Sequence, residues 1–135
     1  MIKKKVLVSN RIRRIEGGFS FIPHRFLTDG FLSSLHQHEI LLYFFLILAS
    51  DRYGLSFYSY DAVCSMLGLS VDEYIEARDG LIKKDLIAFD GTLFQVLHLP
   101  AKLIEVKPPE FIAALDRPRN SGDIANLIQQ SLWEE

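Results

Sequence analysis

The most strongly patterned part of the chain is a ten-residue apolar run from Ile40 to Ala49. The run is apolar on every face, which is typical of a helix enclosed on all sides rather than of a surface helix. It predicts a helix that begins between Ser34 and Gln37 and ends at Ala49. In a small domain, we expect one face of such a helix to meet a flanking segment or a second subunit.

A short strand and a second helix are predicted directly after Gly54. Residues 55–58 form the strand candidate, and Ser59 is placed to cap a helix over residues 60–67 because its hydroxyl can accept a bond from the first turn. Residues 68–70, with the sequence Gly-Leu-Ser, then predict a tight turn between this helix and the next.

The next helix carries the clearest local signal for a beginning. Ser70 is followed three positions later by Glu73, which is the spacing of a capping box, and the helix is predicted to run to about Lys84. Gly80 lies inside it and costs about 1 kcal/mol relative to alanine. Its apolar positions are Val71, Tyr74, Ile75, Leu81 and Ile82.

After Asp85, the spacing of apolar residues changes from a helical period to a period of two residues. Residues 86–89 and 92–99 flank the dipeptide Asp90-Gly91, which tolerates the positive φ angles that a tight hairpin needs. The pattern therefore predicts two antiparallel strands that turn at this dipeptide.

These elements divide the chain into three parts. Residues 1–22 are predicted to form a basic, partly extended arm. Residues 23–100 are predicted to form the folded domain, which begins with a helix over residues 23–32. Residues 101–135 predict a linker followed by an amphipathic helix over residues 124–132.

The order of elements over residues 34–99 resembles a winged helix-turn-helix domain. Residues 80–89 are similar to the join between recognition helix and wing in many bacterial regulators, with Asp85 where glycine is usual. Residues 21–27, Phe-Ile-Pro-His-Arg-Phe-Leu, resemble the amino-terminal domains of phage replication proteins and DnaD-like primosomal proteins. The resemblance implies a mainly α (α+β) fold: a winged helix with a two-stranded wing, a basic amino-terminal arm and a carboxy-terminal helix.

The charges of the chain are unevenly distributed, although the net charge is only −2. Residues 1–18 carry six basic side chains against Glu16 alone, and the remaining residues carry nine basic and sixteen acidic side chains. A basic arm on an acidic body indicates contact with a polyanion, or contact between arm and body within an assembly. A solvated tail is the third interpretation.

Winged-helix domains usually bind duplex DNA by placing the second helix of the motif in the major groove. Here that helix presents Asp72, Glu73 and Glu76 in its first half, where carboxylates would repel phosphates. We therefore expect the arm to contact the phosphates. The alternative is that the arginines of the arm cover acidic surface on the same or a neighbouring subunit. The candidate DNA-binding residues are Lys3, Lys4, Lys5, Arg11, Arg13, Arg14, Arg78, Lys83 and Lys84.

The sequence predicts a non-enzymatic, DNA-associated protein that acts in replication initiation or transcription control. The alternative is a winged-helix module for protein interaction or oligomerisation that does not bind DNA. The acidic helix favours the alternative, and the basic arm favours DNA. We expect a homodimer whose interface is enriched in aromatic side chains, with contributions from Phe44, Phe45, Leu127, Ile128 and Trp133.

No motif in the sequence predicts catalysis, a metal site or a cofactor. His36 and His38 are two residues apart, so on a helix they point to different faces, and Cys64 lies among apolar residues. The longest apolar run is about half the length of a membrane span, and no cleavable signal peptide is visible. With 135 residues and 49% hydrophobic composition, we expect a cytoplasmic globular protein without membrane contact.

Overall fold

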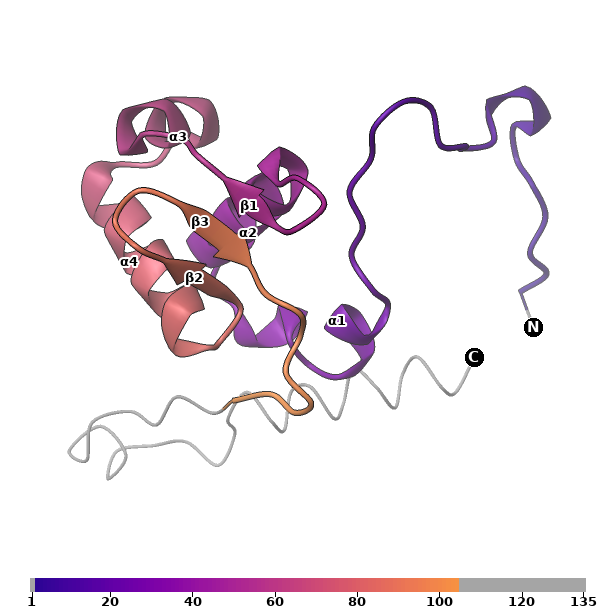
Figure 1. Ribbon diagram of the computed structural model, residues 1–135. Helices are drawn as coiled ribbons and strands as arrows, with labels where there is room; N and C mark the ends of the chain where they lie inside the picture. Colours follow the sequence, from indigo (N-terminus) through magenta and orange to yellow (C-terminus); the bar gives the residue numbers. More distant parts are fainter. Residues whose placement is uncertain (1, 105–135) are drawn as a thin grey trace.

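The computed structural model describes residues 2–104, which form a mixed α+β fold with four α-helices and one antiparallel sheet (Figure 1). The helices are α1 (Arg25–Thr28), α2 (Gln37–Ala49), α3 (Tyr60–Leu67) and α4 (Val71–Lys83). The strands are β1 (Leu55–Ser56), β2 (Ile87–Phe89) and β3 (Phe94–Val96), and 3-10 turns cover Ser9–Arg11 and Leu32–Ser34. The predicted carboxy-terminal helix, with Leu127, Ile128 and Trp133, lies outside the described residues.

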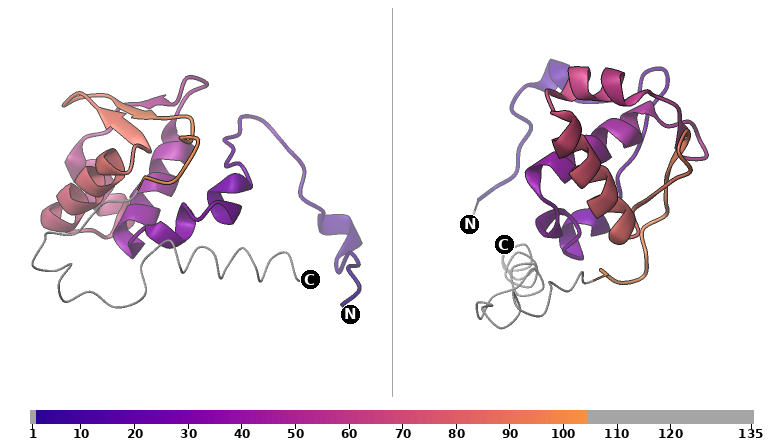
Figure 2. Two further views of the ribbon diagram at one scale, coloured as in Figure 1. Left: turned by 90° about the horizontal axis from the view of Figure 1, so that it is seen from below. Right: turned by 90° about the vertical axis from the view of Figure 1, so that its left-hand side faces the viewer.

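Helix α2 is the centre of the core and has the predicted bounds. Its buried side packs against α4 and against the sheet, as both views of Figure 2 show. Leu42 and Leu46 are fully buried on this side. The opposite side keeps an apolar stripe of Leu41, Phe44 and Leu48 exposed, so the described residues 2–104 do not enclose α2 on every face.

The turn between α3 and α4 closes through backbone bonds that depend on Gly68. This residue has φ +69°, and the N–H of Leu69 donates to the carbonyl of Cys64 at 3.1 Å. A left-handed residue followed by such a bond is the usual glycine ending of a helix. The predicted capping box then begins α4, because Ser70 N–H donates to Glu73 at 2.8 Å and Glu73 N–H donates to Ser70 Oγ at 3.1 Å.

Helix α4 ends in the same way, but with an aspartate in place of glycine. Asp85 has φ +62°, and the N–H of Leu86 donates to the carbonyl of Leu81 at 3.1 Å. Aspartate tolerates the left-handed conformation better than most residues, because its short side chain is compatible with it. The chain can therefore reverse from α4 into β2 at the position where glycine is usual.

The two antiparallel strands predicted after Asp85 are present as β2 and β3, and the strand predicted over residues 55–58 joins them as β1, so the sheet has three strands. Strand β1 pairs with β3, with Leu55 opposite Gln95, and β2 pairs with the other edge of β3, giving the order β1-β3-β2. Strand β3 has one free edge once the hairpin forms, and the chain leaving α2 turns back to pair with it. The third strand therefore depends on the packing of α2.

The hairpin turns at the predicted place but through four residues. Phe89 and Phe94 are the last paired residues, and the loop covers residues 90–93. The Asp90 carboxylate accepts the N–H groups of Thr92 at 2.8 Å and Leu93 at 2.7 Å, which stabilises the wider loop.

One expectation, the extent of the first helix, is corrected. The helix predicted over residues 23–32 is shorter, because α1 ends at Thr28 and Gly30, at φ +86°, redirects the chain. On α4, Val71, Ile75 and Ile82 do not face the core; their exposed fractions are 48%, 37% and 39%. The core side of α4 is formed instead by Tyr74, Ala77 and Leu81.

Candidate functional site

The amino-terminal arm projects from the α1 end of the body, away from α4 and the hairpin (Figures 1 and 2). Residues 2–24 are exposed throughout and contain no strand. Among the described residues, no hydrogen bond or ion pair joins residues 2–22 to residues 23–104. The arm forms one local ion pair, between Arg14 and Glu16 at 3.1 Å. The six predicted arm cations therefore all lie on the exposed arm.

Lys84, by contrast, is part of the core. Its ammonium donates to Glu39 Oε1 on α2 at 2.6 Å and to the carbonyl of Ser34 at 2.9 Å, and its side chain is only 11% exposed. The Glu39 side chain is 5% exposed and also accepts the backbone N–H of His36 at 2.8 Å. Lys84 thus joins the end of α4 to the beginning of α2, and a phosphate would have to displace Glu39 to reach it.

Gly80 allows this ion pair to form. A Cβ atom at position 80 would overlap the carboxylate of Glu39, which lies against the backbone of α4 at this point. The glycine inside the helix therefore serves the close approach of α2 and α4 around a buried carboxylate.

Arg78 is likewise engaged within the body. Its guanidinium pairs with Asp79 at 3.1 Å and lies over the rings of Tyr74, at 5.8 Å, and Phe89, at 5.3 Å. Lys83 is exposed at the end of α4. Of the three cations predicted to contact DNA from α4, only Lys83 is both exposed and outside any described ion pair.

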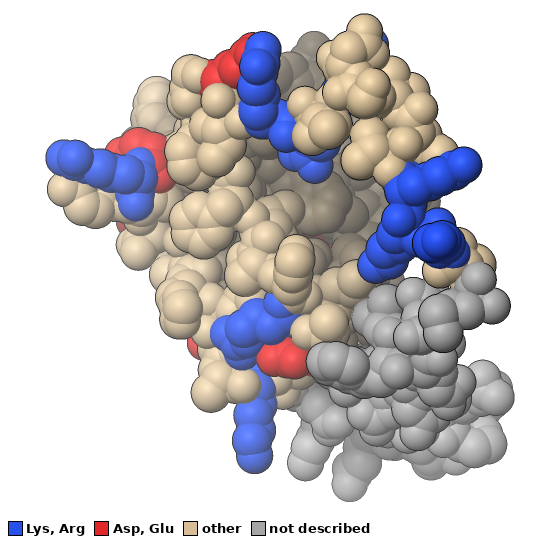
Figure 3. Space-filling view, turned by 90° about the vertical axis from the view of Figure 1, so that its right-hand side faces the viewer, with Lys and Arg blue, Asp and Glu red and all other residues tan. Residues whose placement is uncertain are grey.

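The positive charges do not form one continuous face. The space-filling view of the side from which the arm projects shows lysine and arginine in separate groups around a largely uncharged surface (Figure 3). Because the arm lies away from α4, its cations and Lys83 are on different parts of the molecule.

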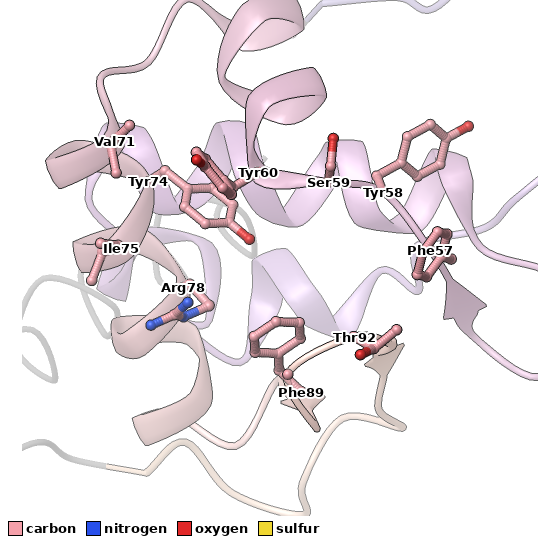
Figure 4. Close-up of a pocket in the computed structure, with 11 residues that line it drawn as sticks. Phe57, Tyr58, Ser59, Tyr60, Val71, Tyr74, Ile75, Arg78, Phe89 and Thr92 are labelled. Atoms are coloured by element: carbon pink, nitrogen blue, oxygen red, sulfur yellow. The ribbon is translucent and has the colours of Figure 1, made fainter.

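A groove of about 730 Å³ lies where the exposed apolar side of α4 faces the hairpin. Helix α4 forms one wall, residues 57–60 form the second, and Phe89 and Thr92 close the third side (Figure 4). Phe57 and Tyr60 are 66% and 51% exposed. A contiguous exposed apolar surface of this kind marks an interaction site more often than the rest of a protein surface does.

The elements that form this groove also carry exposed acidic residues, none of which is among its lining residues. Asp61, Asp72, Glu76, Asp79 and Asp90 are all exposed, and each is next in sequence to a residue that lines the groove. The N–H groups of Leu93 and Thr92 lower the pKa of Asp90 below its usual value, so this carboxylate stays ionised. Arg78 is the one charged side chain among the described lining residues, and it is paired with Asp79.

Phe44 and Phe45, the described residues of the expected dimer interface, differ in their exposure. Phe44 is at the edge of the exposed stripe on α2, with its ring centroid 6.2 Å from that of Phe26. Phe45 is half-buried, and its ring meets Tyr58 edge-on at 5.2 Å. The sequence pattern could not distinguish the exposed Phe44 from the half-buried Phe45, because both lie in one continuous apolar run.

Histidine and cysteine side chains form no cluster in the part of the chain that the structure describes. Within residues 2–104, no three His, Cys, Asp or Glu side chains lie close enough together to hold a metal ion. His38 lies 3.4 Å from Glu73, and burial together with Asp61 raises the pKa of the Cys64 thiol, which keeps it protonated. No helix among these residues has the length and apolar content needed to cross a membrane.

Comparison with known proteins adds no relative: no protein-family profile, no curated protein and no solved structure matches this chain.

Proposed function

We propose that the protein is a non-enzymatic, winged-helix DNA-associated protein that acts in replication initiation or transcription control. In this proposal the arm, not α4, contacts the duplex. The observation that carries it is the placement of six cations, Lys3 to Lys5 with Arg11, Arg13 and Arg14, on an exposed arm that no described hydrogen bond or ion pair joins to the body.

Two features support the winged-helix interpretation. A tight turn joins α3 to α4, as in a helix-turn-helix, and a hairpin follows α4 directly. The third strand, β1, pairs with the hairpin and holds it against α2. The arrangement supports the resemblance to winged-helix domains that the element order suggested.

Helix α4 is poorly suited to reading bases. Asp72, Glu76 and Asp79 are exposed along it, and Arg78 is held over two rings. The hairpin loop 90–93 contains no lysine or arginine. Carboxylates that face phosphates weaken binding, so contacts with duplex DNA would have to come from elsewhere.

A flexible basic arm can supply those contacts by lying along the phosphates or by entering a minor groove. Each neutralised phosphate releases condensed counterions, which makes the binding strong at low salt and independent of sequence. The proposed role is thus to hold the protein on DNA, with little recognition of bases.

A mobility-shift titration of duplex DNA tests the proposal. Replacing the six arm cations with glutamine should abolish the shift, and exchanging lysine for arginine throughout the arm should preserve it. Asp72→Asn with Glu76→Gln should strengthen binding, because two repulsive charges leave the body; Glu73 is kept because it caps α4. A wild-type protein that shifts no duplex at low salt would overturn the proposal.

The second candidate is a protein-interaction module that does not bind DNA. The aromatic groove, formed by elements that carry exposed acidic residues, favours it, since such a surface suits an apolar, cationic protein segment better than a phosphate backbone. This candidate predicts no shift of duplex DNA by wild type, and loss of a protein contact when the groove is altered.

A further inference from the structure

The groove beside α4 has the character of a binding surface for an extended segment. Its walls present the apolar side chains of Phe57, Tyr60, Val71 and Ile75, all of them exposed, and Tyr74 lies deeper (Figure 4). These residues come from α3, α4 and the segment between β1 and α3, so the fold assembles the surface from separate parts of the chain. Apolar side chains of α4 that do not reach the core thus form part of the wall of this groove.

The charges around the groove define what can bind there. Five exposed acidic residues lie next in sequence to its lining residues, and Arg78, the one charged residue among the described lining residues, is paired with Asp79. This excess of carboxylates on the elements that form the groove disfavours a phosphate backbone. A segment that alternates large apolar side chains with lysine or arginine would suit both the aromatic walls and the acidic residues beside them.

The arm of this chain has that composition. Its six cations are interleaved with apolar side chains, and these are exposed without exception: Ile2, Val6, Leu7, Val8, Ile12 and Ile15. Six large apolar side chains on an exposed segment are more than phosphate binding requires. They indicate that the arm also has an apolar contact to make.

The direction of the arm points to a neighbouring molecule. It leaves the body at α1 and projects away from α4 and the hairpin, whereas the groove lies between those two elements (Figures 1 and 4). We infer that the groove receives the amino-terminal arm of a second copy of this chain. This contact goes beyond the proposed binding of DNA, and because both use the same cations, a given arm cannot make both at once.

The test is a mixing experiment on the full chain, purified free of nucleic acid and followed by sedimentation velocity at micromolar concentration. One variant reverses the arm, with Arg11→Glu, Arg13→Glu and Arg14→Glu. The other reverses acidic residues beside the groove, with Asp61→Lys, Asp72→Lys and Glu76→Lys. Each variant alone should associate at least about tenfold more weakly than wild type, because the reversed charges repel.

An equimolar mixture of the two variants should associate again. The reversed arm then meets the reversed groove, and the normal arm meets the normal groove. If the arm occupied the groove of its own chain, mixing would restore nothing, and that result would overturn the inference. A wild-type protein that is monomeric throughout would overturn it as well.

A pair of uncharged variants separates this contact from one through α2. Phe57→Ser should weaken association by about tenfold, and Leu48→Ser, which removes an equally exposed apolar side chain from α2, should leave it unchanged. The reverse pattern would contradict the inference. The groove-reversed variant keeps its arm, so its duplex shift reports on the proposed function separately: association can fail while the shift remains, or the shift can fail while association remains.

Discussion

Lys83 and Lys84 are adjacent at the end of α4 and have opposite environments. Lys83 is exposed, whereas Lys84 is paired with Glu39 inside the body. No local pattern distinguishes the two, because the partner lies 45 residues away. For this reason the sequence placed both lysines among the candidate DNA contacts, and only the packing of α2 against α4 separates them.

The two lysines should therefore differ in their effect on stability. Lys84→Met leaves the buried carboxylate of Glu39 without its cation, and breaking such a pair lowers the free energy of unfolding by about 3–5 kcal/mol. Lys83→Met should change it by no more than about 0.5 kcal/mol. Urea denaturation of both variants measures the difference, and equal effects would contradict the assignment of Lys84 to the core.

Gly80→Ala should destabilise the protein, although alanine is the better helix former. Helix propensity alone favours alanine by about 1 kcal/mol. The added Cβ, however, overlaps the Glu39 carboxylate and would displace it from Lys84. Thermal denaturation should show a lower midpoint for Gly80→Ala than for wild type, and a higher midpoint would show that α2 and α4 are not held this closely.

At the scale of the elements, local signals were sufficient where the chain itself sets the boundary. The capping residues Ser59 and Ser70 and the turn glycine Gly68 fixed α3 and the beginning of α4, and all three act as predicted. The pairing of the predicted strand β1 with β3 and the exposed side of α4 could not be predicted in the same way. Both depend on which surfaces remain free after α2, α4 and the hairpin have packed.

The capping box of α4 should make stability depend on pH. The N–H of Ser70, with a smaller effect from His38, lowers the pKa of Glu73 below its ordinary value of 4.5. A carboxylate with a lowered native pKa stabilises the fold fully above its unfolded pKa, and this contribution is lost as pH falls through the native value. Thermal midpoints of wild type should therefore fall more steeply below about pH 4.5 than those of Glu73→Gln. Parallel curves would exclude this role.

At the scale of the whole molecule, the arm and the body have opposite charge, and no described hydrogen bond or ion pair joins them. The charge asymmetry was visible in the sequence, together with the three interpretations that it allows. The groove was not, because its walls come from three separate segments whose apolar residues looked like core positions. The structure thus locates both kinds of charge. The cations lie on the exposed arm, and exposed carboxylates lie on the elements that form an aromatic groove.

The central claim, that the arm supplies the contacts with DNA, is tested most directly by the salt dependence of duplex affinity. Six neutralised phosphates give a slope of log affinity against log salt of up to about −5. Wild type measured by fluorescence anisotropy should approach this slope, and the variant with six arm glutamines should show a slope near zero at greatly reduced affinity. A wild-type slope near zero, or a slope unchanged in the variant, would contradict the claim.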